Sequence, residues 1–116
     1  MKLNLKEIAM QVEKELKELA KLTEAYHNGE LDEDPLEEFF DRILDISRVQ
    51  QLLIDGWETI SYEVCLAWGG PGIWLETGSY TIRVAWWGDY VEWHVYDPDA
   101  REAIDMIHDY LHEIYG

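Results

Sequence analysis

The fold is decided at residues 60–68, which read ISYEVCLAW. Apolar side chains alternate there with smaller or polar ones, and a period of two is typical of a β-strand with one buried face. Much of the sequence before this stretch instead shows the period of 3.6 residues that amphipathic helices have. The change of period predicts an α+β domain in which helices cover one face of an antiparallel sheet.

Three helices are predicted around the strands. The first covers residues 4–27 and ends at Asn28-Gly29, because glycine adopts the left-handed conformation that closes a helix. The second covers residues 35–54 and the third covers residues 98–115. Both begin with an Asp-Pro pair, in which the carboxylate caps the helix and the proline occupies its first position.

Four strands are predicted between the last two helices, at residues 59–68, 73–77, 80–87 and 90–96. A two-residue loop at Gly88-Asp89 would place Arg83 opposite His94 and Thr81 opposite Tyr96. The expected order is ααββββα, a two-layer domain with a four-stranded antiparallel meander. No linker divides residues 1–116, so we expect a single domain.

A loop at Gly78-Ser79 fixes the register of the middle strands in the same way. It would place Trp74 opposite Arg83 on one face and Leu75 opposite Ile82 on the other.

Composition excludes several classes of protein. The chain of 116 residues is 47% hydrophobic, too rich in apolar side chains for intrinsic disorder. Cys65 is the single cysteine, which excludes an intramolecular disulfide and favours a reducing compartment, so we expect a cytoplasmic protein. No stretch is apolar over the roughly 18 to 20 residues of a membrane span. The net charge of −16 disfavours direct binding to nucleic acid or to an anionic membrane.

The charge is unevenly distributed along the chain. Residues 1–21 hold five lysines and four glutamates, a balance of +1. The remaining residues hold 21 acidic side chains and four arginines, a balance of −17. An uneven charge distribution creates an electric field that accelerates encounter with an oppositely charged partner. The alternative is that the acidic composition only keeps the protein soluble.

Eight carboxylates lie within sixteen residues, and Arg42 is the only basic residue among them. On a helix over residues 35–54, four of them would line one face over roughly 16 Å. Their separation resembles that of phosphates along a nucleic-acid strand, so this surface could occupy the basic groove of a protein that handles nucleic acid. The simpler interpretation is a solvated helix face. The eight residues are Glu30, Asp32, Glu33, Asp34, Glu37, Glu38, Asp41 and Asp45.

The last predicted helix carries Asp105, His108, Asp109 and His112 on one flank. Two histidines four residues apart can bind one metal ion, and HDYLH is similar to the zincin motif His-Glu-x-x-His with aspartate in place of the general base. Packing alone also explains histidines beside an apolar stripe. We expect neither a cofactor nor a catalytic residue.

The outer face of the predicted sheet is rich in aromatic side chains. Aromatic residues and arginine are enriched in the binding hot spots of interfaces, so we expect a partner there, with a second copy of the chain as its occupant. Ordinary cross-strand pairing is the alternative. The residues of this face are Trp74, Arg83, Trp87, Tyr90, Glu92, His94 and Tyr96.

A resemblance adds to this interpretation. The segment GGPGIWLET at residues 69–77, followed by Trp86-Trp87-Gly88 and an acidic last helix, is similar to uncharacterised proteins of mobile elements over about residues 60–115. The chain also resembles, as a type, the small acidic α+β proteins of bacteriophages that disable host nucleases, namely anti-CRISPR and anti-restriction proteins. That resemblance implies binding and blocking without catalysis, in some members by nucleic-acid mimicry, and it carries over no functional residue.

The sequence therefore favours a non-catalytic inhibitor that binds the basic surface of a nucleic-acid-handling defence protein. Three alternatives stay open. One is an immunity protein or antitoxin that neutralises a basic toxin. Another is a metal-dependent enzyme that uses the last helix, and the third is an adaptor that self-associates through its sheet face.

Overall fold

The computed structural model describes residues 4–116 and contains three helices and five strands. The order is ααβββββα, so the α+β class is confirmed and the expected four strands are corrected to five. The elements are α1 (Leu5–His27), α2 (Pro35–Asp41), β1 (Asp45–Leu53), β2 (Gly56–Ala67), β3 (Gly72–Glu76), β4 (Thr81–Trp86), β5 (Asp89–His94) and α3 (Pro98–Tyr115).

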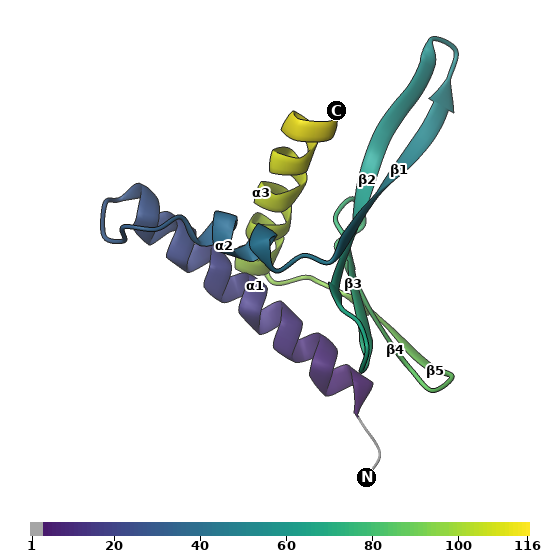
Figure 1. The fold of residues 1–116 in the computed structure, drawn as a ribbon, viewed down its shortest axis with the longest axis horizontal. Helices are drawn as coiled ribbons and strands as arrows, with labels where there is room; N and C mark the ends of the chain where they lie inside the picture. Colours follow the sequence, from purple (N-terminus) through teal and green to yellow (C-terminus); the bar gives the residue numbers. More distant parts are fainter. Residues whose placement is uncertain (1–3) are drawn as a thin grey trace.

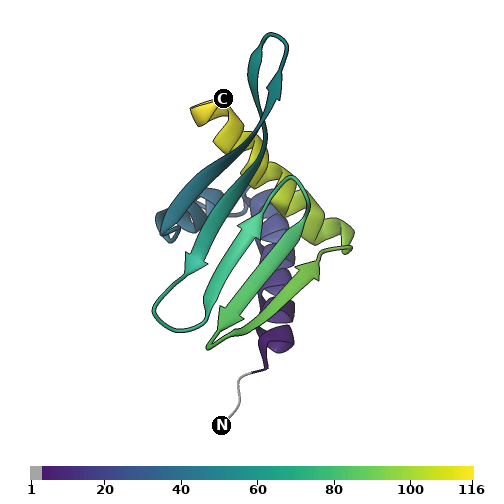
Figure 2. The same cartoon turned by 90° about the vertical axis from the view of Figure 1, so that its right-hand side faces the viewer.

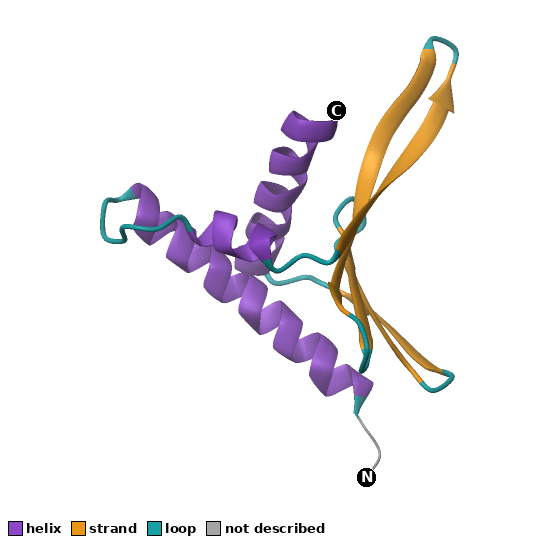
Figure 3. Ribbon diagram, in the orientation of Figure 1, coloured by secondary structure: helices purple, strands orange, loops and turns teal. Residues whose placement is uncertain are grey.

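The five strands form one antiparallel meander in the order β1-β2-β3-β4-β5. All three helices lie on the same side of this sheet (Figures 1 and 3). The β1–β2 hairpin extends beyond the other strands, beside the carboxyl end of α3 (Figure 2). Among residues 4–116, therefore, no element covers the opposite face of the sheet or the projecting hairpin.

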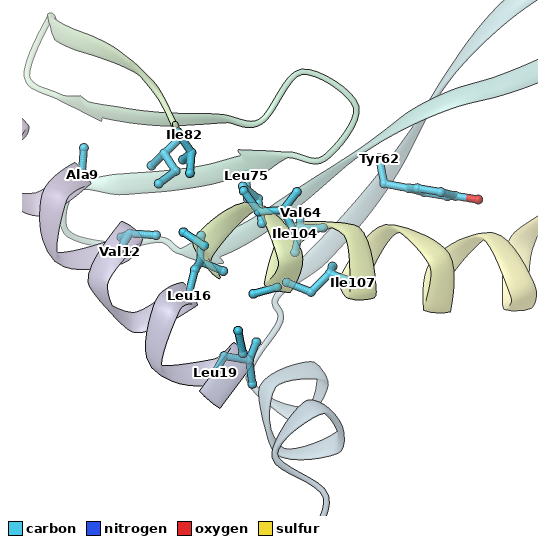
Figure 4. Packing of buried hydrophobic residues seen from close by; sticks show 14 of the residues in the cluster. Ala9, Val12, Leu16, Leu19, Tyr62, Val64, Leu75, Ile82, Ile104 and Ile107 are labelled. Atoms are coloured by element: carbon cyan, nitrogen blue, oxygen red, sulfur yellow. The ribbon is translucent and has the colours of Figure 1, made fainter. Parts of the chain in front are cut away.

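The hydrophobic core lies between the sheet and the two long helices (Figure 4). The apolar stripe of α1 includes the buried Val12 and Leu16, and that of α3 includes Ile104 and Ile107. Strands β2, β3 and β4 contribute fully buried side chains from their inner face: Tyr62, Val64, Leu75, Ile82 and Val84. Each helix thus buries the stripe that its 3.6-residue period predicts.

The helix caps follow the expected chemistry. Asp34 and Asp97 accept hydrogen bonds from the backbone N–H groups that begin α2 and α3, and each is followed by proline. Asn4 caps α1 in the same way. None of the described helices has the length and apolarity that crossing a membrane would require.

The prediction of one helix over residues 35–54 is wrong. The helix ends at Asp41, and residues 45–53 form β1, an edge strand that pairs with β2. The apolar residues Ile46, Val49 and Leu53 have helical spacing but lie on a strand that is largely exposed, where burial imposes no alternation. At Asp55-Gly56, expected to stop a helix, the chain instead turns: Ile54 and Asp55 form the two-residue loop of the β1–β2 hairpin, and Gly56 begins β2.

The predicted register of the last hairpin is wrong by two residues. Arg83 pairs with Glu92, and the loop is Trp87-Gly88 instead of Gly88-Asp89. Both loop residues have positive φ, 48° and 83°, as the type I′ turn requires. A shift of two preserves which side chains share a face. The register predicted between β3 and β4 is confirmed, with Trp74 opposite Arg83.

The cap of α3 yields a pH-dependent prediction. Hydrogen bonding from the Ala100 backbone N–H, with help from nearby Lys17, lowers the pKa of Asp97 below 3.8. The ionised carboxylate therefore stabilises the fold above the unfolded-state pKa, and this stability is lost as the pH falls through the lower folded-state value.

Asp97→Asn keeps a capping oxygen but removes the charge. We expect its Tm, followed by circular dichroism, to lie below that of the wild type at pH 7 and to converge on it as the pH falls below 3.8, the ordinary carboxyl pKa. A difference in Tm that stays constant across this range would contradict the proposed role of the charge.

Candidate functional site

The acidic surface, defined as the eight carboxylates of residues 30–45, spans the α1–α2 loop, α2 and the first residue of β1. The loop lies at the end of the molecule farthest from the sheet (Figure 1). All of these residues except Asp34 are exposed, and Asp34 is half-buried because it caps α2. Within residues 4–116, no member of the acidic surface forms an ion pair.

The geometry of this surface differs from the predicted row on a single helix. Asp34, Glu38 and Asp41 follow α2 over about 10 Å, at about 1.5 Å per residue. Asp45 belongs to β1 and therefore does not continue their line. A single helical row of four carboxylates is thus not formed, and the acids form a patch that is continued by a loop.

A groove of about 340 Å³ lies between α1 and α2 beside the acidic surface. Its apolar lining includes Leu16, Leu19 and Phe39. The carboxylate-bearing Glu15, Glu18 and Glu38 line the same groove, together with Arg42. The groove combines apolar contact area with an excess of negative charge, and long basic side chains suit that combination because their aliphatic stems pack while their charged ends stay solvated.

Arg83 is the centre of an ionic cluster on the outer sheet face. Its guanidinium donates to Glu63 at 3.2 Å and to Glu92 at 3.4 Å, and it also pairs with Glu76. Burial opposes its charge, but the hydrogen bond and attraction to Glu76 raise the pKa of Arg83. The side chain is 24% exposed, and it pairs with three carboxylates, which lie on β2, β3 and β5.

Aromatic side chains gather at one end of the same face. Trp68 and Trp74 meet edge to face, with ring centroids 5.8 Å apart. Trp87 meets Trp86 edge to face at 5.6 Å, although Trp86 itself packs against the core on the inner side of the sheet. With Tyr90 they line a shallow cavity of about 530 Å³. Trp87 is 85% exposed and has a positive φ, which is uncommon for a bulky side chain. The predicted residues Trp74, Trp87 and Tyr90 are therefore brought together.

The other predicted members of the sheet face lie outside the aromatic group. His94 lies opposite Thr81, with its Nδ1 atom 3.2 Å from the threonine hydroxyl oxygen. Tyr96 follows the end of β5, and its ring centroid lies 5.4 Å from the Arg101 guanidinium of α3. The sheet face consequently divides into an ionic part around Arg83 and an aromatic part.

The histidines of α3 are engaged by the sheet. His108 Nδ1 lies 2.7 Å from the Thr77 hydroxyl oxygen, and His112 Nδ1 lies 3.5 Å from the Tyr62 hydroxyl. The two imidazole rings are nearly parallel, 6.2 Å apart. Nowhere in residues 4–116 do three His, Cys, Asp or Glu side chains gather closely enough to hold a metal ion.

The other two candidates on this flank also lack a metal-binding arrangement. Asp105 accepts a hydrogen bond from the Tyr80 hydroxyl at 2.6 Å, which raises the pKa of Tyr80. Asp109 is exposed to solvent. This side of α3 therefore serves packing against the sheet in the described structure.

Sequence reasoning missed the apolar surface of the projecting hairpin. Leu52 is 63% exposed, Ile54 is fully exposed and Trp57 is 67% exposed. The apolar run LLI at residues 52–54, directly followed by Asp55-Gly56, was the signal that could have revealed it.

A groove of about 510 Å³ separates the base of this hairpin from α3. Arg48 of β1 donates to the Tyr115 carbonyl at 3.1 Å, and the Thr59 hydroxyl of β2 donates to the Gly116 carbonyl at 3.1 Å. These two bonds join the hairpin to the carboxyl end of α3, so its inner side is anchored at that point.

Comparison with known proteins gave no match to any family profile, to any curated protein or to any solved structure.

The ionic cluster predicts a measurable loss of stability. Arg83→Met would leave three carboxylates near one another without their shared cation, at a cost of about 1.5–3 kcal/mol in the free energy of unfolding. Urea denaturation measures this difference. Arg42→Met, at an exposed arginine, serves as the control and should change stability by less than about 0.5 kcal/mol. Equal stability of Arg83→Met and the wild type would contradict the assigned role of Arg83.

Proposed function

We propose that the protein is a non-catalytic inhibitor that binds and blocks a basic, nucleic-acid-handling protein, of the kind represented by anti-CRISPR and anti-restriction proteins. The observation that carries this proposal is the acidic surface. Seven of its eight carboxylates are exposed, and none is in an ion pair within residues 4–116. Their mutual repulsion costs stability in the free chain and is relieved when a basic partner binds.

The groove between α1 and α2 supports the same function. A purely solvating surface needs only charge, whereas Leu22, Phe39 and Leu66, which also line this groove and are partly exposed, offer apolar contact area beside the carboxylates. Aliphatic stems of lysine or arginine side chains can pack against such area while their charged ends meet Glu18 or Glu38. Proteins that hold nucleic acid present such side chains in their grooves, since they bind phosphates with them.

A pair of charge-matched variants tests the proposed function. Glu33, Glu37 and Asp41 are changed to lysine in the test variant, which keeps the capping Asp34 intact. Glu102, Asp109 and Glu113, all exposed on α3, are changed to lysine in the control, so both variants have the same net charge.

Each form is immobilised and used to capture proteins from a nuclease-treated bacterial lysate, and the retained proteins are assayed for inhibition of nucleic-acid binding or cleavage. We expect the wild type and the α3 control to retain and inhibit a nucleic-acid-handling protein that the test variant loses. Equal retention by all three forms, or retention without inhibition, would count against the proposal.

A further inference from the structure

We propose that β1 is the interface of a homodimer, in which two copies of the chain pair their β1 strands antiparallel around a two-fold axis at Val49. The two sheets would then become one continuous sheet with the helices of both copies on the same face. This inference does not rest on the function proposed for the acidic surface, with which β1 shares only its first residue, Asp45.

The backbone edge of β1 is open. β1 is an end strand of the sheet and runs for nine residues, and within the described part of the chain it pairs with β2 alone. The irregularity in this hairpin comes from an extra residue, Ile60, on β2, because Val49 and Gln50 are consecutive while their partners Ser61 and Thr59 are not. β1 itself therefore keeps the regular alternation that pairing with a further strand requires.

The two edges of the sheet differ in how they are protected. The other edge strand, β5, has only six residues and carries Asp89 and Glu92, and charges on a short edge strand oppose edge-to-edge pairing. In β1, the eight residues after Asp45 carry one charge, that of Arg48, whose guanidinium is bonded to the Tyr115 carbonyl. The long edge thus lacks the charges that block association.

A second copy fits this edge because the sequence of β1 is self-complementary. Pairing about Val49 sets Ile46 against Leu52 of the second copy and places Arg48 opposite Gln50. Ser47 meets Gln51, and the two Val49 side chains face each other. Apolar residues meet apolar ones and polar residues meet polar ones in these pairs, which cover residues 46–52, and each residue meets its symmetry mate as in any isologous interface. Only the end pair, Asp45 with Leu53, does not match in polarity.

The charge distribution also favours β1 as the contact between two copies. Two copies that each carry a net charge of −16 repel one another over most of their surfaces. Residues 46–54 form a stretch with a single charge, and the hairpin projects away from the rest of the molecule (Figures 1 and 2). The exposed Leu52, Leu53 and Ile54 of this stretch would lose solvent contact on pairing.

Sedimentation equilibrium over a range of protein and salt concentrations tests the dimer. We expect a mass twice the 13.7 kDa of one chain, with dissociation that weakens as salt rises, because screening removes the repulsion but not the apolar contact. Val49→Lys places like charges opposite each other and should raise the dissociation constant tenfold or more, while its circular dichroism stays that of the wild type.

Disulfide trapping provides a test that does not depend on the folding of that variant. Val49→Cys should form an intermolecular disulfide on mild oxidation, since opposed Cα atoms of paired strands lie about 4.5–5.5 Å apart, within reach of a disulfide. Glu102→Cys, exposed on α3, is the control and should not cross-link.

A wild type that stays monomeric at all concentrations would overturn the proposal. A dimer that is unaffected by Val49→Lys but dissociates in Trp87→Asp would also overturn it, because the interface would then be the aromatic part of the outer sheet face.

Discussion

The fold depends on burying one face of the meander sheet under two amphipathic helices. Val64, Leu75 and Ile82 project from adjacent strands, and all three are fully buried beneath α1 and α3. Since apolar burial is the main favourable term in folding, these two helices must occupy that face. Charged side chains are consequently confined to the outer sides of the helices, the connecting loops and the opposite face of the sheet.

Three surfaces outside this core differ in how their exposed side chains are paired. Arg83 ties together carboxylates from three neighbouring strands and so stabilises the uncovered sheet face. The α1–α2 loop and α2 instead accumulate carboxylates with no compensating ion pair within residues 4–116. Residues 46–54 of the projecting hairpin carry large exposed apolar side chains and a single charge, that of Arg48. The last two surfaces lower the stability of the free chain, and for that reason we propose that partners bind them.

Sequence periodicity predicted the parts of the fold that one-sided burial dictates. The stripes of α1 and α3, the Asp-Pro helix starts and the pairing of Trp74 with Arg83 were all expected. Strand β1 was not expected, because an edge strand that is exposed at most positions shows no alternation. Its apolar residues Ile46, Val49 and Leu53 also have the spacing of a helical stripe. The members of the acidic surface could be read from the sequence, but their layout could not, since it depends on where α2 ends.

Competition with nucleic acid tests whether the acidic surface occupies the partner's nucleic-acid-binding site. A labelled DNA or RNA duplex is bound to the partner captured through the acidic surface, and the protein is titrated into the complex while fluorescence anisotropy reports the duplex that remains bound. Our account predicts that the protein displaces the duplex, because carboxylates and phosphates would compete for the same basic side chains. A stable ternary complex, with the duplex retained at saturating protein, would contradict it.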